Sequence, residues 1–118
     1  MSDRHGGKPR VALVVDHPQR DLAGLVLTAF ELCRHGATCY LVPLNLQERE
    51  VWALAPDFVL LNYARLPNER FAHRLTEARI GFGVLDTEGG VWPDEAAYLS
   101  LLWRDRSLFR QEIGRAHV

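Results

Sequence analysis

Val11-Ala12-Leu13-Val14-Val15 is a continuous apolar run in which three of the five residues are valine. A run of this kind, with no polar residue at alternate positions, is typical of a strand buried on both faces in a parallel sheet. The next five residues, Asp16-His17-Pro18-Gln19-Arg20, predict a turn, because Pro18 disfavours helical backbone at His17. A buried strand followed by a short turn is the first step of an α/β fold.

The hydrophobic pattern then changes from continuous to helical. From Asp21 onwards apolar residues recur every three or four positions, which predicts an amphipathic helix. Asp21 is suited to the start of this helix and Gly36 to its C-terminal cap. The predicted apolar face consists of Leu22, Leu25, Val26, Ala29, Phe30 and Cys33.

The same alternation of strand and helix continues along the chain. Further strands are predicted over residues 38–42, 57–62 and 80–85, and further helices over 46–55, 68–78 and 94–109. Four strands alternating with helices through short connections are typical of βαβ units. We therefore predict one Rossmann-like or flavodoxin-like domain over residues 10–111, with a parallel sheet of at least four strands and helices on both faces. Residues 1–9 are polar and are expected to form a disordered lead-in.

Composition excludes several function classes. The chain has 118 residues, 47% hydrophobic and 25% charged, as expected of a single globular domain. A net charge of −1 gives no basic excess, which argues against nucleic acid as a partner. No apolar run reaches the roughly 18 residues of a membrane-spanning helix, and residues 1–10 lack the apolar core of a signal peptide. These features predict a cytoplasmic protein with no integral membrane segment.

The two cysteines, Cys33 and Cys39, are predicted to be small buried hydrophobic residues rather than a disulfide. Their spacing does not match a metal-ligand pattern, so no metal site is predicted.

Residues 112–118 interrupt the last helical pattern. They can be back-translated as GAG-ATC-GGA-AGA-GCA-CAC-GTC, which resembles a common sequencing-adapter sequence read in frame. We expect this tail to be adapter-derived and the gene product to continue into a further domain. On this interpretation the chain is an N-terminal piece of a larger protein.

Candidate functional residues follow the predicted strands, because ligands of open α/β sheets bind beyond the carboxyl ends of their strands. The loop after the first strand holds Asp16, His17 and Arg20, and the loop after the third holds Asn62. Arg20 is suited either to binding an anionic group or to pairing with a nearby acid such as Asp16 and bracing the loop. His17 is suited to proton transfer or to a solvated loop position.

The loop after the fourth strand carries the strongest signal, Asp86-Thr87-Glu88-Gly89-Gly90. Asp86 and Glu88 are candidate catalytic carboxylates, which would act as a general base on a sugar hydroxyl or as a nucleophile. The alternative is that they only bond turn amides or cap the next helix. Gly89 and Gly90 allow a ligand to approach the backbone closely. Trp92 follows and is a candidate for stacking on a sugar ring.

Two nucleotide-binding motifs are absent. The chain has no Gly-x-Gly-x-x-Gly after its first strand and no Gly-x-x-x-x-Gly-Lys-[Ser/Thr] phosphate loop. Nothing in these residues therefore predicts a cofactor on this chain.

Three segments together resemble bacterial surface carbohydrate biosynthesis proteins. The segment His17-Pro18-Gln19-Arg20-Asp21-Leu22-Ala23-Gly24-Leu25 resembles the first strand-to-helix turn of that family, and residues 36–42 resemble the capped helix end and strand that follow it. Leu85-Asp86-Thr87-Glu88-Gly89-Gly90-Val91 resembles the family's Asp-x-Glu-Gly loop. Thr87 stands where the family commonly has a further acid.

This family is similar to GT-B glycosyltransferases, in which two Rossmann-like domains face each other across a cleft. The resemblance spans residues 10–110 and implies the N-terminal, acceptor-side domain, inactive alone. A carbohydrate acceptor would bind near Asp16, His17, Arg20 and Asn62. The sugar-nucleotide donor would bind mainly to the C-terminal domain beyond this chain. An apolar interface exposed by the absence of that domain would favour self-association.

A second resemblance belongs to a different class of protein. Val14-Val15-Asp16-His17-Pro18 and residues 56–67 resemble the first acidic turn and the phosphoacceptor strand of response-regulator receivers. Asn62 occupies the phosphoacceptor position, and only one acid follows the first strand, so a magnesium site would lack ligands. The alternative functions are therefore a pseudo-receiver or a flavodoxin-like binding module without catalysis.

Overall fold

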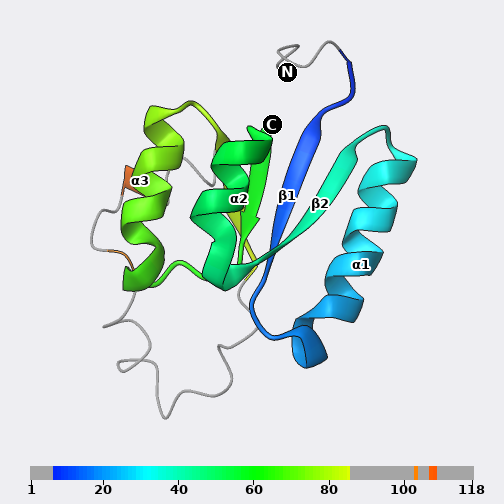
Figure 1. Ribbon diagram of the computed structural model, residues 1–118, viewed down its shortest axis with the longest axis horizontal. Helices are drawn as coiled ribbons and strands as arrows, with labels where there is room; N and C mark the ends of the chain where they lie inside the picture. Colours follow the sequence, from blue (N-terminus) through cyan, green and yellow to red (C-terminus); the bar gives the residue numbers. More distant parts are fainter. Residues whose placement is uncertain (1–6, 86–102, 104–106, 109–118) are drawn as a thin grey trace. The chain divides into compact units, whose positions relative to one another are not determined.

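The computed structural model describes residues 7–85, 103 and 107–108. Its strands form a parallel four-stranded sheet in the order β2-β1-β3-β4 (Figure 1). The predicted α/β class is therefore confirmed, and the order is the flavodoxin-like one, in which the third strand joins the sheet beside the first. By contact density the chain divides into two compact units, Met1–Leu60 and Leu61–Val118.

The first unit begins with a strand, a helix and a second parallel strand. These are β1 (Arg10–Val15), α1 (Pro18–Arg34) and β2 (Thr38–Pro43), and β1 pairs with β2 from Arg10 opposite Thr38 to Val15 opposite Pro43. The helix begins three residues earlier than predicted. Pro18 occupies its first turn, where a proline ring costs no hydrogen bond and its fixed φ suits a helix.

Both faces of β1 are buried. Leu25 of α1 packs on one face against Val11, Leu13 and Val15. The other face presents Ala12 and Val14, which are also buried. The chain passes from β2 back across β1 to β3 (Phe58–Leu61), through the 3₁₀ turn η1 (Leu44–Leu46) and helix α2 (Gln47–Leu54). A right-handed crossover in this reversed direction puts α2 on the face opposite α1.

Asp57 ties the start of β3 to the start of β1. Its carboxylate accepts a hydrogen bond from the backbone N–H of Arg10 at 2.8 Å, and its own N–H donates to the Arg10 carbonyl at 2.8 Å. Asp57 is buried, so this reciprocal pair satisfies polar groups at the strand ends that water does not reach.

The second unit contains the 3₁₀ turn η2 (Leu66–Asn68), helix α3 (Glu69–Glu77) and strand β4 (Gly81–Val84). Phe71 and Leu75 of α3 are buried and form its apolar face. Trp103 is fully buried, lies edge-on to Phe82 with ring centroids 5.8 Å apart, and donates its backbone N–H to the Ala64 carbonyl at 2.9 Å. A residue distant in sequence therefore completes this core.

The apolar face of α1 is wider than the surface that the sheet covers. Leu25 is buried as predicted, but Leu22, Val26 and Phe30 are exposed. Cys33 is exposed as well, so the prediction that both cysteines are buried is wrong for Cys33, while Cys39 is half-buried. These four positions lie to one side of the line that faces the sheet, because they are displaced from Leu25 around the helix.

None of the helices in the described part of the chain is long and apolar enough to cross a membrane.

Candidate functional site

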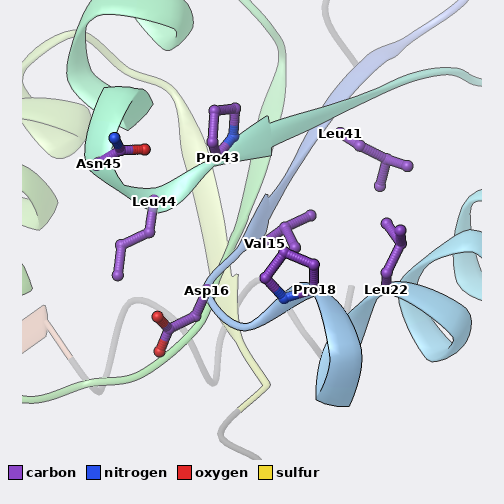
Figure 2. Close-up of a pocket in the computed structure, with 8 residues that line it drawn as sticks. All are labelled: Val15, Asp16, Pro18, Leu22, Leu41, Pro43, Leu44 and Asn45. Carbon is purple, nitrogen blue, oxygen red and sulfur yellow. The ribbon is translucent and has the colours of Figure 1, made fainter.

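A groove lies at the carboxyl ends of β1 and β2, within the first unit (Figure 2). Its volume is about 570 Å³, comparable with small-molecule sites in proteins. Two loops form it, one leading from β1 into α1 and the other from β2 into η1. It is lined by Val15, Asp16, Pro18, Leu22, Leu41, Pro43, Leu44 and Asn45.

The groove has an apolar wall and two polar side chains. Leu22 and Leu41 lie on one side of the groove, whereas the Asp16 carboxylate and the Asn45 amide lie on the other side, with Leu44 between them (Figure 2). A carboxylate accepts hydrogen bonds, and an amide both donates and accepts them. Such a lining suits a ligand with hydroxyl groups on one side and C–H surface on the other. The place of Asn45 in the groove becomes apparent only once the two loops are brought together.

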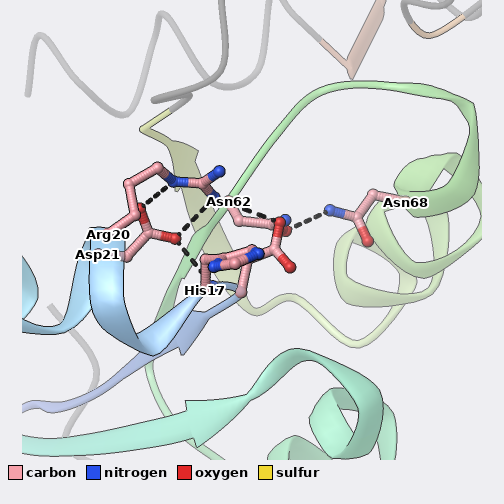
Figure 3. A network of polar contacts seen from close by, with 6 residues as sticks. His17, Arg20, Asp21, Asn62 and Asn68 are labelled. Carbon is pink, nitrogen blue, oxygen red and sulfur yellow. Dashed lines mark hydrogen bonds and ion pairs between the residues drawn. The ribbon is translucent and has the colours of Figure 1, made fainter.

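Arg20 is held by acids of its own loop (Figure 3). Its Nε donates to Asp21 Oδ1 at 2.7 Å and its Nη2 to Asp21 Oδ2 at 2.9 Å, which is a bidentate ion pair. A second ion pair joins Nη2 to Asp16 Oδ2 at 3.5 Å. Of the two roles predicted for Arg20, this geometry favours bracing the loop. It also fixes Asp16 on its side of the groove.

Asp21 closes the turn that precedes α1. Its Oδ2 accepts a hydrogen bond from the His17 backbone N–H at 3.1 Å, while the His17 carbonyl accepts from the Asp21 N–H at 2.7 Å. This is a reciprocal N-terminal cap, with the acid one position later than in the usual capping box. The sequence predicted Asp21 at the start of this helix, and in the structure it caps the helix from the fourth position and is only 9% exposed.

His17 contributes backbone groups to this turn. It is the N-cap residue of α1, makes no capping hydrogen bond with its side chain, and is exposed. An exposed imidazole at this position agrees with the solvated loop residue that was one of its two predicted roles.

Asn62 lies in the second unit, in the loop after β3. Its Oδ1 accepts a hydrogen bond from Asn68 Nδ2 at 3.1 Å (Figure 3), and the same Nδ2 donates to the Tyr63 carbonyl at 3.0 Å. Asn68 is 1% exposed and precedes α3, so its two hydrogen bonds connect the start of that helix to the residues just after β3. Sequence reasoning missed this role. The only signal was an asparagine at the predicted start of a helix, which usually indicates a cap.

Arg65 completes this loop. It is buried, and its guanidinium carbon lies 3.9 Å from the centroid of the Tyr63 ring, in cation–π contact.

The predicted catalytic loop lies outside the described residues. These predictions concern Asp86, Glu88, Gly89, Gly90 and Trp92, and they stay predictions. β4 ends at Val84, and the Leu85 N–H donates to the Leu61 carbonyl at 3.0 Å, so the described chain runs to the position just before Asp86.

The two cysteines interact where α1 and β2 meet. Cys39 Sγ lies 3.7 Å from the Ala29 carbonyl oxygen, as a donor to it. Burial, followed by a hydrogen bond with Cys33 and the proximity of that thiol, raises the pKa of Cys39 from 9.0 to about 11. At neutral pH Cys39 is therefore a protonated thiol and a poor nucleophile.

No cluster of three or more His, Cys, Asp or Glu side chains suited to a metal ion occurs among the residues that the structure describes. Comparison of the chain with protein-family models, with curated proteins and with solved structures finds no match.

Proposed function

We propose that this chain is the acceptor-side domain of a GT-B-like glycosyltransferase that takes part in bacterial surface polysaccharide synthesis. The observation that carries the proposal is the groove at the carboxyl ends of β1 and β2. Its apolar wall and its two polar side chains, Asp16 and Asn45, are the kinds of group that bind a sugar ring. The resemblance of residues 17–22 and 86–89 to surface carbohydrate biosynthesis proteins supports the same function.

The proposed reaction transfers a glycosyl group to an acceptor hydroxyl. Asp86 or Glu88 takes the hydroxyl proton as the oxygen attacks the anomeric carbon of a sugar nucleotide. A new C–O bond forms, the bond from the anomeric carbon to the phosphate oxygen breaks, and the nucleoside diphosphate leaves. The donor would be held by a further domain, and its use of sugar nucleotides would place the enzyme in the cytoplasm.

Within this scheme the loop after β1 positions the acceptor. Asp16 accepts hydrogen bonds from acceptor hydroxyls, and Arg20 keeps its carboxylate in place through the 3.5 Å ion pair. Arg20 is itself oriented by Asp21. The proposal therefore makes Arg20 and Asp21 positioning residues, and Asp16 a substrate-binding residue.

Binding of carbohydrate to the full 118-residue chain tests the proposal. Two-dimensional NMR of ¹⁵N-labelled protein, titrated with a panel of bacterial cell-surface oligosaccharides, should shift the amide signals of Asp16, Leu41 and Asn45. Asp16→Asn should weaken binding about tenfold, as expected for loss of a charge-assisted hydrogen bond. Glu31→Gln, an exposed acid on α1 outside the groove, should bind like the wild type. Shifts spread evenly over the surface, or none at millimolar ligand, would contradict the proposal.

The catalytic step is tested in a protein that carries both this domain and the donor-binding domain that the proposal requires. We expect Asp86→Asn or Glu88→Gln to abolish glycosyl transfer from a sugar nucleotide, and Asp16→Asn to raise the KM for the acceptor with a smaller effect on kcat. Full transfer by both Asp86→Asn and Glu88→Gln would exclude the acidic loop as the source of the base.

A second candidate function is a flavodoxin-like or pseudo-receiver binding module. The strand order β2-β1-β3-β4 favours it, because flavodoxins and receivers share this order. Against a phosphorylation switch, Asn62 replaces the phosphoacceptor and its side chain is engaged by Asn68. Titration with Mg²⁺ and beryllofluoride, a phosphoryl mimic, should leave the NMR spectrum unchanged if the glycosyltransferase proposal is right.

A further inference from the structure

An exposed apolar stripe runs along α1. Leu22, Val26 and Phe30 are 39%, 46% and 58% exposed, and their spacing of four residues puts them in one line along the helix. Each belongs to the apolar face that the sequence predicts, yet the sheet buries only the neighbouring line through Leu25. The stripe is therefore apolar surface that the described part of the first unit leaves uncovered.

Contacts at both ends show that the stripe borders β2. Near the start of α1, Leu22 and Leu41 line the same groove and lie on facing sides of it (Figure 2). Near the end of α1, Cys33 interacts with Cys39. Leu41 is itself 41% exposed. We call Leu22, Val26, Phe30, Leu41 and the outer edge of β2 the α1–β2 face.

β2 is the outermost strand on its side of the described sheet (Figure 1). The Thr38 N–H donates to the Pro9 carbonyl at 2.8 Å, so the backbone groups of Thr38 point towards β1. Because these groups alternate in direction along a strand, those of Cys39 and Leu41 point away from β1. Pro43 has no N–H, so it ends the edge that another strand could join.

We propose that two copies of this chain associate through their α1–β2 faces, with their β2 strands antiparallel about a twofold axis at Tyr40. In this register Cys39 lies opposite Leu41 of the second copy, and the two residues exchange both backbone hydrogen bonds. By symmetry Leu41 of the first copy pairs with Cys39 of the second in the same way. The two pairs give four hydrogen bonds, and the two sheets become one. The inference does not depend on the proposed function.

A second copy fits this face because the strand and helix spacings agree. The twofold axis puts both α1 helices on the same side of the joined sheet, with their stripes facing each other. Each α1 covers β1 and β2, so the two helix axes would be separated by about two strand spacings, roughly 10 Å. That is the distance at which helices pack side by side. Val26 would lie near the axis and face Val26 of the second copy, and on either side of the axis Leu22 of one copy would lie opposite Phe30 of the other.

The area of the face sets the expected strength. The four apolar side chains expose on the order of 300–400 Å², the size of patch that marks interaction sites. A standard interface buries about 800 Å² on each partner, so the strand edge and polar rim must supply the rest. We therefore expect a dimer with a dissociation constant in the micromolar range.

Sedimentation velocity of the full chain tests the proposal. Between about 1 and 200 µM the weight-average mass should rise from 13.4 kDa towards twice that value. Val26→Glu should weaken association at least tenfold, because it buries two like charges near the axis. Leu27→Glu is the matched control, since Leu27 is 67% exposed and lies on the side of α1 that faces away from the sheet, outside the line of Leu22, Val26 and Phe30. Circular dichroism checks that both variants fold. A monomeric wild type at 200 µM, or equal weakening by both variants, would overturn the proposal.

A disulfide tests the register. Leu41→Cys, in a Cys33→Ser background, places a thiol opposite Cys39 of the second copy, within the Cα separation that a disulfide needs. Mild oxidation with oxidised glutathione, which accepts the two electrons and two protons, should give a covalent dimer. Cys33→Ser alone should not. A covalent dimer in neither protein, at concentrations where the wild type is dimeric, would overturn the antiparallel register.

Discussion

At the scale of single residues, the Asp21 side chain links the Arg20 guanidinium to the His17 backbone at the start of α1. Its carboxylate accepts two hydrogen bonds from Arg20 and one from the His17 backbone. The sequence showed an acid in the first turn of a helix, which predicts a cap and no more. The hydrogen bond from the His17 N–H to the Asp21 carboxylate depends on where the helix begins. The helix begins at Pro18, three residues before the predicted start.

Loss of the Asp21 carboxylate should therefore destabilise the fold measurably. Asp21→Ala removes a buried carboxylate that pairs with Arg20, and we expect the free energy of unfolding to fall by about 2 kcal/mol. Glu31→Ala removes one partner of the Arg34–Glu31 pair, in which both side chains are more than half exposed, and should change it by less than about 0.5 kcal/mol. Urea denaturation measures both. Similar losses in the two variants would contradict the supporting role of Asp21.

Cys39 gives a prediction about pH. Because burial and Cys33 raise the pKa of Cys39 from 9.0 to about 11, the folded state favours the protonated thiol. Its contribution to stability is complete below pH 9 and is lost as pH rises from 9 to 11. The free energy of unfolding of the wild type, minus that of Cys39→Ala, should fall over this interval. Other titrating groups cancel in the difference, so a constant difference would contradict the raised pKa.

At the scale of elements, sequence patterns predicted types well and ends less well. All four strands within residues 10–85 lie where the sequence predicted them. The pattern is clearest in β1, where burial on both faces leaves no polar position in the strand interior. The apolar face of α1 was misleading, because hydrophobic spacing shows which residues are apolar but not what covers them. Leu22, Val26 and Phe30 follow the helical period as well as Leu25 does.

At the end of α2, an alanine-to-glycine substitution is expected to raise the free energy of unfolding at one position and to lower it at another. Ala55 follows the helix in a left-handed conformation, with φ of 46°, which L side chains adopt at a cost. Ala55→Gly should therefore stabilise the fold by about 0.5–1 kcal/mol, after the larger entropy of glycine in the unfolded chain is counted. Ala53→Gly, at an exposed position inside the same helix, should cost about 1 kcal/mol. Thermal denaturation of both proteins checks the pair, and destabilisation by Ala55→Gly would contradict it.

At the scale of the whole molecule, the sequence predicted the parallel α/β class but left the strand order open. With alternating strands and helices, the third strand could join the sheet next to β1 or next to β2. The reciprocal hydrogen bonds of Arg10 and Asp57 fix the choice, yet a lone Asp before a strand gives no such signal. The groove was predictable as a set of strand ends. Its members Leu22 and Leu41 were not, because they come from a helix and a strand interior.

Trp103 joins parts of the second unit that are distant in sequence. It is fully buried against Phe82 of β4, and its backbone N–H reaches the Ala64 carbonyl after β3. Trp103→Ala would leave a large cavity, and we expect it to lower the free energy of unfolding by about 3–5 kcal/mol. Trp103→Phe keeps an aromatic ring against Phe82 and should cost less than half as much. Urea denaturation, followed by circular dichroism so that the signal does not depend on tryptophan, measures both. A cost for Trp103→Ala below about 1 kcal/mol would mean that the core of this unit forms without the ring, and that its stability comes from α3 and β4 alone.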